Sequence, residues 1–121
     1  TVFNGTPNLA PYVASKGALL ALGRVAAREF GAHGIRVNTI TPGLVDTRPS
    51  PTGVLPGHDA SVAGRCLSRV EVPRDLVGAV VFLASDDSRF ISGQTLNVDG
   101  GFNLHWLRRR CRARVDTAVR T

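Results

Sequence analysis

Methionine is absent from the chain, and 121 residues contain only two Cys, one Tyr and one Trp. A natural protein of this length without even an initiator Met is unusual, so we interpret the sequence as part of a longer protein. Cys66 and Cys111 lie far apart and match no metal-ligand spacing. We therefore predict no metal site, and we favour two free thiols in a reducing cytoplasm over a disulfide.

Long apolar runs are also missing. No stretch approaches the roughly 18 apolar residues that a membrane-spanning helix needs. The first residues show no basic segment followed by an apolar one, so no signal peptide is visible. We therefore predict no membrane association. Apolar residues still make up 43% of the chain, which is typical of a globular protein and too high for a disordered one.

The basic charge is concentrated at one end of the chain. Of the net charge of +6, residues 1–105 contribute +1, from nine basic and eight acidic residues. Residues 106–121 contribute +5, from six Arg and one Asp. Because such charge runs are usually solvated, we predict one domain over 1–105 and a dispensable, disordered tail over 106–121. The tail could bind nucleic acid, but it lacks the interleaved aromatic residues that stack on bases.

Residues 11–30 have the periodicity of a helix. Pro11 is acceptable in a first turn, and Gly31 and Gly34 supply the stop signal. Apolar residues recur at spacings of three and four, as in a helix that covers a core: Leu19, Leu22, Val25, Ala26 and Phe30. The opposite face is small enough for another backbone or a ligand to approach closely: Ala14, Gly17, Ala18 and Ala21.

Two strands and a second helix follow. β-branched residues predict a strand at 35–41, and a second strand is predicted at 94–99. A helix is predicted between them at 73–84, with a stripe that we assign to the core: Leu76, Val80 and Leu83. The stretch 48–70, rich in Pro, Gly and Ser, is predicted to be a long loop, with a short helix near 60–67.

This order of elements favours an α/β fold. Strands joined by helical crossovers form a parallel sheet. Two strands are too few for such a sheet, which is normally flanked by further strands and buried on both faces. The pattern therefore predicts one edge of a larger α/β sheet, incomplete in this chain.

Tyr12 and Lys16 are the first candidates for chemistry, because residues four apart lie on the same helix face. A free Tyr hydroxyl has a pKa of about 10, and a nearby ammonium favours its phenolate. Such a pair could exchange a proton with an alcohol or carbonyl oxygen. Taken alone, the spacing favours a surface Tyr beside a solvated Lys.

Three segments together resemble the short-chain dehydrogenase/reductase family. They are PYVASKGA at 11–18, IRVNTITPG at 35–43 followed by Val45 and Thr47, and ISGQTLNVDGG at 91–101. They occur in the family's order and span roughly residues 1–104. The resemblance implies the C-terminal part of a Rossmann-like, doubly wound parallel sheet, similar to the 3-oxoacyl reductases. It also implies an NAD- or NADP-dependent oxidoreductase that interconverts an alcohol and a carbonyl.

The resemblance also implies roles for individual residues. Tyr12 would be the catalytic acid/base, and Lys16 would bind the nicotinamide ribose. Four residues would line the nicotinamide pocket: Pro42, Gly43, Val45 and Thr47. From the residues alone, Pro42-Gly43 could be a plain turn and Thr47 could be a helix N-cap. Asn38 is interpreted as a structural residue that bonds a loop.

Other features depart from the family pattern. The family's catalytic Ser would fall at or just before residue 1, and its glycine-rich phosphate loop lies further upstream. The chain alone is therefore expected to be inactive. Residues 48–70 are expected to cover a small-molecule alcohol or carbonyl substrate, and the parent protein to be a dimer or tetramer. The alternatives are a non-catalytic fragment, a subunit-interaction module built on the 11–30 helix and the last strand, and a basic-tail nucleic-acid binder.

Overall fold

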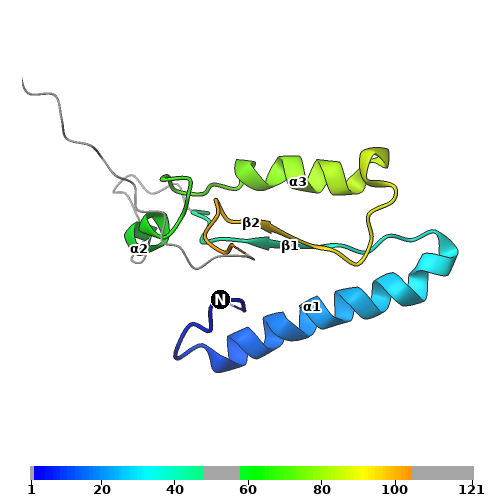
Figure 1. The fold of residues 1–121 in the computed structure, drawn as a ribbon, viewed down its shortest axis with the longest axis horizontal. Coiled ribbons are helices and arrows are strands. Elements are labelled where there is room, and N and C mark those ends of the chain that lie inside the picture. Colours follow the sequence, from blue (N-terminus) through cyan, green and yellow to red (C-terminus); the bar gives the residue numbers. More distant parts are fainter. Residues whose placement is uncertain (1, 48–57, 105–121) are drawn as a thin grey trace, which may run out of the picture.

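The computed structural model describes residues 2–47 and 58–104. It contains α1 (Ala10–Phe30), β1 (Thr39–Pro42), α2 (His58–Ala63), α3 (Arg74–Ala84) and β2 (Thr95–Val98), with short 3₁₀ turns at Gly31–His33 and Asp86–Ser88. β1 and β2 pair in parallel, and α1 and α3 lie on opposite sides of this two-stranded sheet (Figure 1). The predicted tail at 106–121 and the loop residues 48–57 lie outside the described residues. No helix within 2–47 or 58–104 is long and apolar enough to cross a membrane.

Both strands are shorter than their β-branched runs suggest. Their register pairs Thr39 with Thr95 and Pro42 with Val98, so the strand predicted at 35–41 begins four residues late and ends one residue later. The segment before Thr39 bonds to the 92–94 segment through side chains as well as backbone, for example from the Gly93 N–H to the Val37 carbonyl at 2.7 Å. The Ser92 hydroxyl accepts from the Val37 N–H at 3.2 Å, and the Asn38 amide carbonyl accepts from the Gln94 N–H at 3.1 Å.

The face of α1 toward the sheet carries Leu20, Gly23 and Ala27, whereas Ala14, Ala18 and Ala21 of the predicted small face are exposed. Among the described residues, Leu20 is the only buried apolar side chain. Gly23 lies so close to β1 that an added Cβ would be 2.8 Å from Thr39 Oγ1, and Ala27 packs against Gly93. The predicted apolar stripe points away and is mostly exposed: Leu19, Leu22, Val25 and Phe30. Gly23 and Ala27 occupy sheet-facing positions because their small side chains let the helix backbone approach the strand.

The core assignment for the second helix was wrong at one position. Leu76, Ala79 and Leu83 are half-buried, as spacings of three and four on one face require, whereas Val80 is 52% exposed. Val77 and Val81, beside Val80, are also exposed. The short helix predicted near 60–67 runs instead from His58 to Ala63, because Arg65 turns inward to bond the chain at 44 and 69.

Arg36 closes the end of α3. Its guanidinium donates to the Leu83 carbonyl at 2.9 Å, the Ser85 carbonyl at 3.2 Å and the fully buried Ser88 hydroxyl at 2.9 Å. A cation at a helix C-terminus satisfies carbonyls that have no partner within the helix, and it also complements the dipole. This bond set ties the segment before β1 to the crossover that leads into β2.

An exposed ion pair between Arg69 and Asp75 should make stability depend on pH. Arg69 donates to both oxygens of Asp75, at 2.6 and 2.7 Å, and these bonds lower the pKa of Asp75 to about 2. Because the folded-state pKa lies below the ordinary value of 3.8, the stabilisation is complete above about pH 4 and disappears as pH falls toward 2. Thermal melts of the protein as its gene encodes it should therefore show Asp75→Asn lowering the melting temperature most above pH 4. Glu29→Gln, a matched loss of one exposed carboxylate, should not reproduce that profile, and a constant difference from pH 6 to 2 would contradict the assignment.

Candidate active site at the end of strand β1

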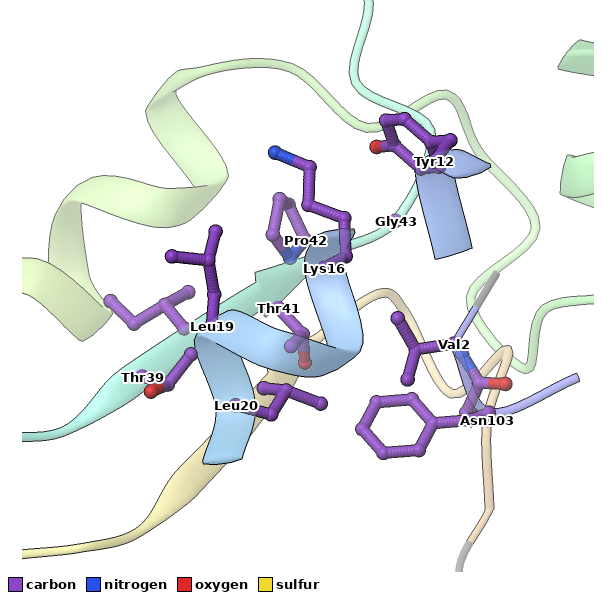
Figure 2. A pocket seen from close by; sticks show the side chains of 12 residues that line it. Val2, Tyr12, Lys16, Leu19, Leu20, Thr39, Thr41, Pro42, Gly43 and Asn103 are labelled. Carbon is purple, nitrogen blue, oxygen red and sulfur yellow. The ribbon is translucent and has the colours of Figure 1, made fainter. Parts of the chain in front are cut away.

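A pocket of about 270 Å³ lies between α1 and the carboxyl end of β1. The carboxyl ends of parallel strands are where ligands bind in open α/β sheets. Tyr12 and Lys16 extend from α1 beside Pro42 and Gly43, with Val2 and Asn103 on the other side (Figure 2). The rest of the lining is largely apolar: Phe3, Leu19, Leu20, Thr39, Ile40 and Thr41. A hydroxyl and an ammonium therefore converge on a mostly apolar hollow.

Tyr12 and Lys16 are brought together by the local geometry of α1. The Lys16 ammonium lies 5.5 Å from the centroid of the Tyr12 ring, a distance at which the cation is attracted to the ring face. Tyr12, Lys16 and Leu20 follow at intervals of four, so they share one helix face. Leu20 is the residue of that face that packs on the sheet, and it thereby directs the other two toward the strand end.

The other four sequence-predicted site residues divide into two groups. Pro42, the last residue of β1, and Gly43 line the pocket. Val45 and Thr47 are not among its lining residues. Val45 instead forms a parallel bridge with Glu71. Thr47 is exposed, and the residues that follow it lie outside the described chain.

A buried ion pair that sequence reasoning missed lies behind Pro42 and Gly43. Arg65 Nη2 lies 3.0 Å from Glu71 Oε2, with 2% and 6% of the two side chains exposed. The same nitrogen donates to the Leu44 carbonyl at 3.0 Å, and Nη1 donates to the Arg69 carbonyl at 3.1 Å. Arg65 Nε has no hydrogen-bond partner among residues 2–47 and 58–104. Apart from the bond between them, the two side chains therefore bond mainly to backbone groups, at Gly43, Leu44 and Arg69.

Burial raises the pKa of the Glu71 carboxyl above its ordinary value. The hydrogen bond from the Gly43 N–H and the positive charge of Arg65 offset only part of this shift. Glu71 Oε1 lies 3.3 Å from the Gly43 nitrogen, which also donates to the Val98 carbonyl at 3.1 Å. Spacing offered no signal for this pair, because neither residue lies in a periodic segment.

Asp99 orders the chain after β2, on the Asn103 side of the pocket. Its buried carboxylate accepts from the backbone N–H groups of Gly101, Phe102 and Asn103, and from the Asn103 amide, at 2.9 to 3.1 Å. Three such bonds turn the backbone sharply, with Gly100 and Gly101 at positive φ. Asn38 has the structural role expected of it, since its amide donates to the Ile91 carbonyl at 2.9 Å.

Known proteins have sequences similar to this one. A family model described as enoyl-(acyl carrier protein) reductase matches residues 2–103. A short-chain dehydrogenase/reductase of Armillaria gallica is 42% identical over 106 residues, which cover 80% of this chain and 40% of that protein. A 3-oxoacyl-[acyl-carrier-protein] reductase of Chlamydia trachomatis is 37% identical over 97 residues, covering 80% and 39%. The chain thus spans about 40% of the length of these curated relatives.

Solved structures share the fold. A 4-hydroxyisoleucine dehydrogenase complexed with NADH and succinate matches with a TM-score of 0.73 and 35% identity, over 84% of this chain and 42% of that one. A blue fluorescent protein from a metagenomic library, in complex with NADPH, matches with a TM-score of 0.73 and 40% identity, over 83% and 40%. The predicted α/β fold of Rossmann type is confirmed, with only part of it present here. Because the family model covers most of the chain, the chain belongs to the short-chain dehydrogenase/reductase family.

Proposed function

We propose that this chain forms the nicotinamide side of the active site in an oxidoreductase that interconverts an alcohol and a carbonyl with NAD or NADP. One observation carries the proposal: Tyr12 and Lys16 share a pocket with Pro42 and Gly43 at the carboxyl end of β1. The similarity to structures described as complexes with NADH or NADPH supports the cofactor class. The substrate is a small alcohol or carbonyl compound, and a cytoplasmic homo-oligomer is proposed for the whole protein.

The pocket fits a nicotinamide riboside in its chemistry. Its mostly apolar lining suits a flat ring, and the Lys16 ammonium offers donors to ribose hydroxyls. Pro42 and Gly43 would flank the ring, while Val45 and Thr47, further along the same segment, would reach its carboxamide through their backbone and hydroxyl. The bound cofactor would supply or accept the hydride.

Proton transfer to and from the substrate is carried out by residues of this chain. In carbonyl reduction the Tyr12 hydroxyl gives its proton to the substrate oxygen, and in alcohol oxidation the phenolate takes it back. The Lys16 ammonium lies on the same helix face, 5.5 Å from the centroid of the Tyr12 ring.

The exposed stripe of α1 favours a second, non-catalytic candidate, a subunit-interaction module. Leu19, Leu22 and Val25 are each at least half exposed, and apolar patches of this kind mark interaction sites. That function does not account for the convergence of Tyr12 and Lys16 on the strand end. We therefore place it second.

Lys16→Met tests the proposal in the protein as its gene encodes it. Met keeps the apolar stem and removes the ammonium, so we expect the dissociation constant for NADH or NADPH to rise by about tenfold or more, at about 1.4 kcal/mol per factor of ten. Turnover should fall as well, because Tyr12 loses its neighbouring charge. Fluorescence titration and steady-state kinetics measure both effects. Arg24→Met, a matched loss of a cation two turns further along α1, is the control; equal affinity in the Lys16→Met and wild-type proteins would contradict the role of Lys16.

A further inference from the structure

The Arg65–Glu71 pair lies directly against Gly43. A Cβ built on Gly43 would collide with Glu71 Oε2 and would lie 2.7 Å from Arg65 Nη2. Gly43 is not among the glycines with positive φ, so its backbone conformation does not require glycine. Glycine is required at this position because the ion pair occupies the space that a Cβ would fill. The Pro42-Gly43 sequence at the end of β1 is thus explained by a close approach of charged side chains, in addition to any turn.

The pair also forms hydrogen bonds to the backbone from Gly43 onward. Glu71 Oε1 accepts from the Gly43 N–H, and Arg65 Nη2 donates to the Leu44 carbonyl. The backbone of Glu71 bridges to Val45, and its carbonyl accepts from the Asp46 N–H at 2.8 Å. Four consecutive residues, 43–46, are therefore tied to Arg65 and Glu71 by side-chain or backbone contacts.

We infer that Arg65 and Glu71 are positioning residues, which hold backbone segment 43–46 in the conformation that binds the nicotinamide end of the cofactor. This inference rests on the proposed function, which places Gly43 and Val45 beside the ring. Neither Arg65 nor Glu71 lines the pocket, so both act through the backbone that they hold. Disturbing the pair should weaken cofactor binding without removing any group that contacts the substrate.

The chain supplies a matched control for this role. Arg69 and Asp75 are also six residues apart and also form an ion pair, but the Arg69 side chain is 57% exposed. The Arg69 guanidinium donates to Asp75 and to the Val70 carbonyl, and the Asp75 carboxylate also accepts from the Val72 N–H. Breaking the Arg69–Asp75 pair therefore perturbs the same stretch of chain and leaves the bonds to 43–46 in place.

The decisive variant is the double substitution Arg65→Met with Glu71→Leu, in the protein as its gene encodes it. Replacing a whole buried ion pair with apolar residues often leaves stability unchanged or improved. The double variant should therefore melt close to the wild-type temperature, yet it still lacks the bonds to Gly43 and Leu44. We expect its KM and dissociation constant for NADH or NADPH to rise by about tenfold or more, with kcat at saturating cofactor within about threefold of wild type. Asp75→Asn should leave the cofactor KM unchanged.

Hydrogen exchange of the Glu71→Gln variant covers the case in which the double variant does not fold. Exchange should accelerate in a peptide that spans 43–46 and stay near wild type in one that spans Arg36 and Asn38. The positioning role would be overturned if the stable double variant had a cofactor KM within about twofold of wild type. It would also be overturned if exchange in the Glu71→Gln variant accelerated equally in both peptides. A wild-type protein that binds neither NADH nor NADPH would instead overturn the proposed function, so the two failures are distinguishable.

Discussion

Tyr12→Phe is expected to reduce turnover by about 10²–10⁴-fold, the usual contribution of a general acid or base, while the protein keeps its fold and its cofactor affinity. The substitution removes one hydroxyl from a side chain that is half exposed at the pocket, so it leaves no buried polar group without a partner. Phenylalanine keeps the ring against which the Lys16 ammonium lies. The loss should therefore fall on kcat, with little change in the KM for the cofactor.

The measurement compares steady-state kinetics of wild type, Tyr12→Phe and Ser15→Ala, each in the protein as its gene encodes it, with a thermal melt of each. Ser15→Ala also deletes a single hydroxyl from α1, one that bonds back to the Tyr12 carbonyl at 2.8 Å, so it controls for disturbance of the helix. Tyr12→Phe turnover within about tenfold of wild type would remove Tyr12 from the proton-transfer role.

The 121-residue chain by itself is expected to aggregate or to fold only in part. Leu20 is the only buried apolar side chain among the described residues, and even it is 9% exposed. Both helices turn apolar residues to solvent, and several of these side chains are at least half exposed: Leu19, Leu22 and Val25 on α1, and Val77, Val80 and Val81 on α3. Exposed patches of this kind drive association.

The free energy lost by leaving these apolar side chains exposed supports the same expectation. Fully burying one Leu or Val side chain contributes about 1.5–3 kcal/mol, and a small domain has only about 5–15 kcal/mol of net stability. With six such side chains at least half exposed, most of that stabilisation is missing from the chain alone. The two-stranded sheet also has an edge along β1 and another along β2, and unpaired strand edges are templates for pairing with other copies.

Light scattering and thermal melts on the purified chain test this expectation. The protein as its gene encodes it is the comparison, and it should be monodisperse with a cooperative transition. Leu22→Glu with Val81→Glu, which places charges in both exposed patches, should raise the solubility of the chain without restoring cooperativity. A monodisperse monomer with a sharp, reversible transition for the unaltered chain would mean that it is a complete folding unit.

The sequence by itself determined the local features of this protein. α1, α3 and the two strands follow from periodicity, Pro and Gly signals and β-branched runs, which act over neighbouring residues. The crossover from β1 through α3 to β2 predicted the parallel pairing. The family followed from three motifs, and the placement of Tyr12 and Lys16 on one helix face followed from their spacing of four.

Only the tertiary structure decided which faces are covered and which distant groups meet. Periodicity shows that Leu19 and Leu22 share a stripe, but not that Leu20, Gly23 and Ala27 face the sheet, since that depends on how closely a backbone can approach β1. Arg36 and Ser88 are 52 residues apart in sequence, and Gly43 and Glu71 are 28 apart. Their bonds depend on how the chain returns to itself, so no local pattern marks them. The glycine at 43, read from sequence as the end of a strand, is required by a buried ion pair whose partners become neighbours only in the folded chain.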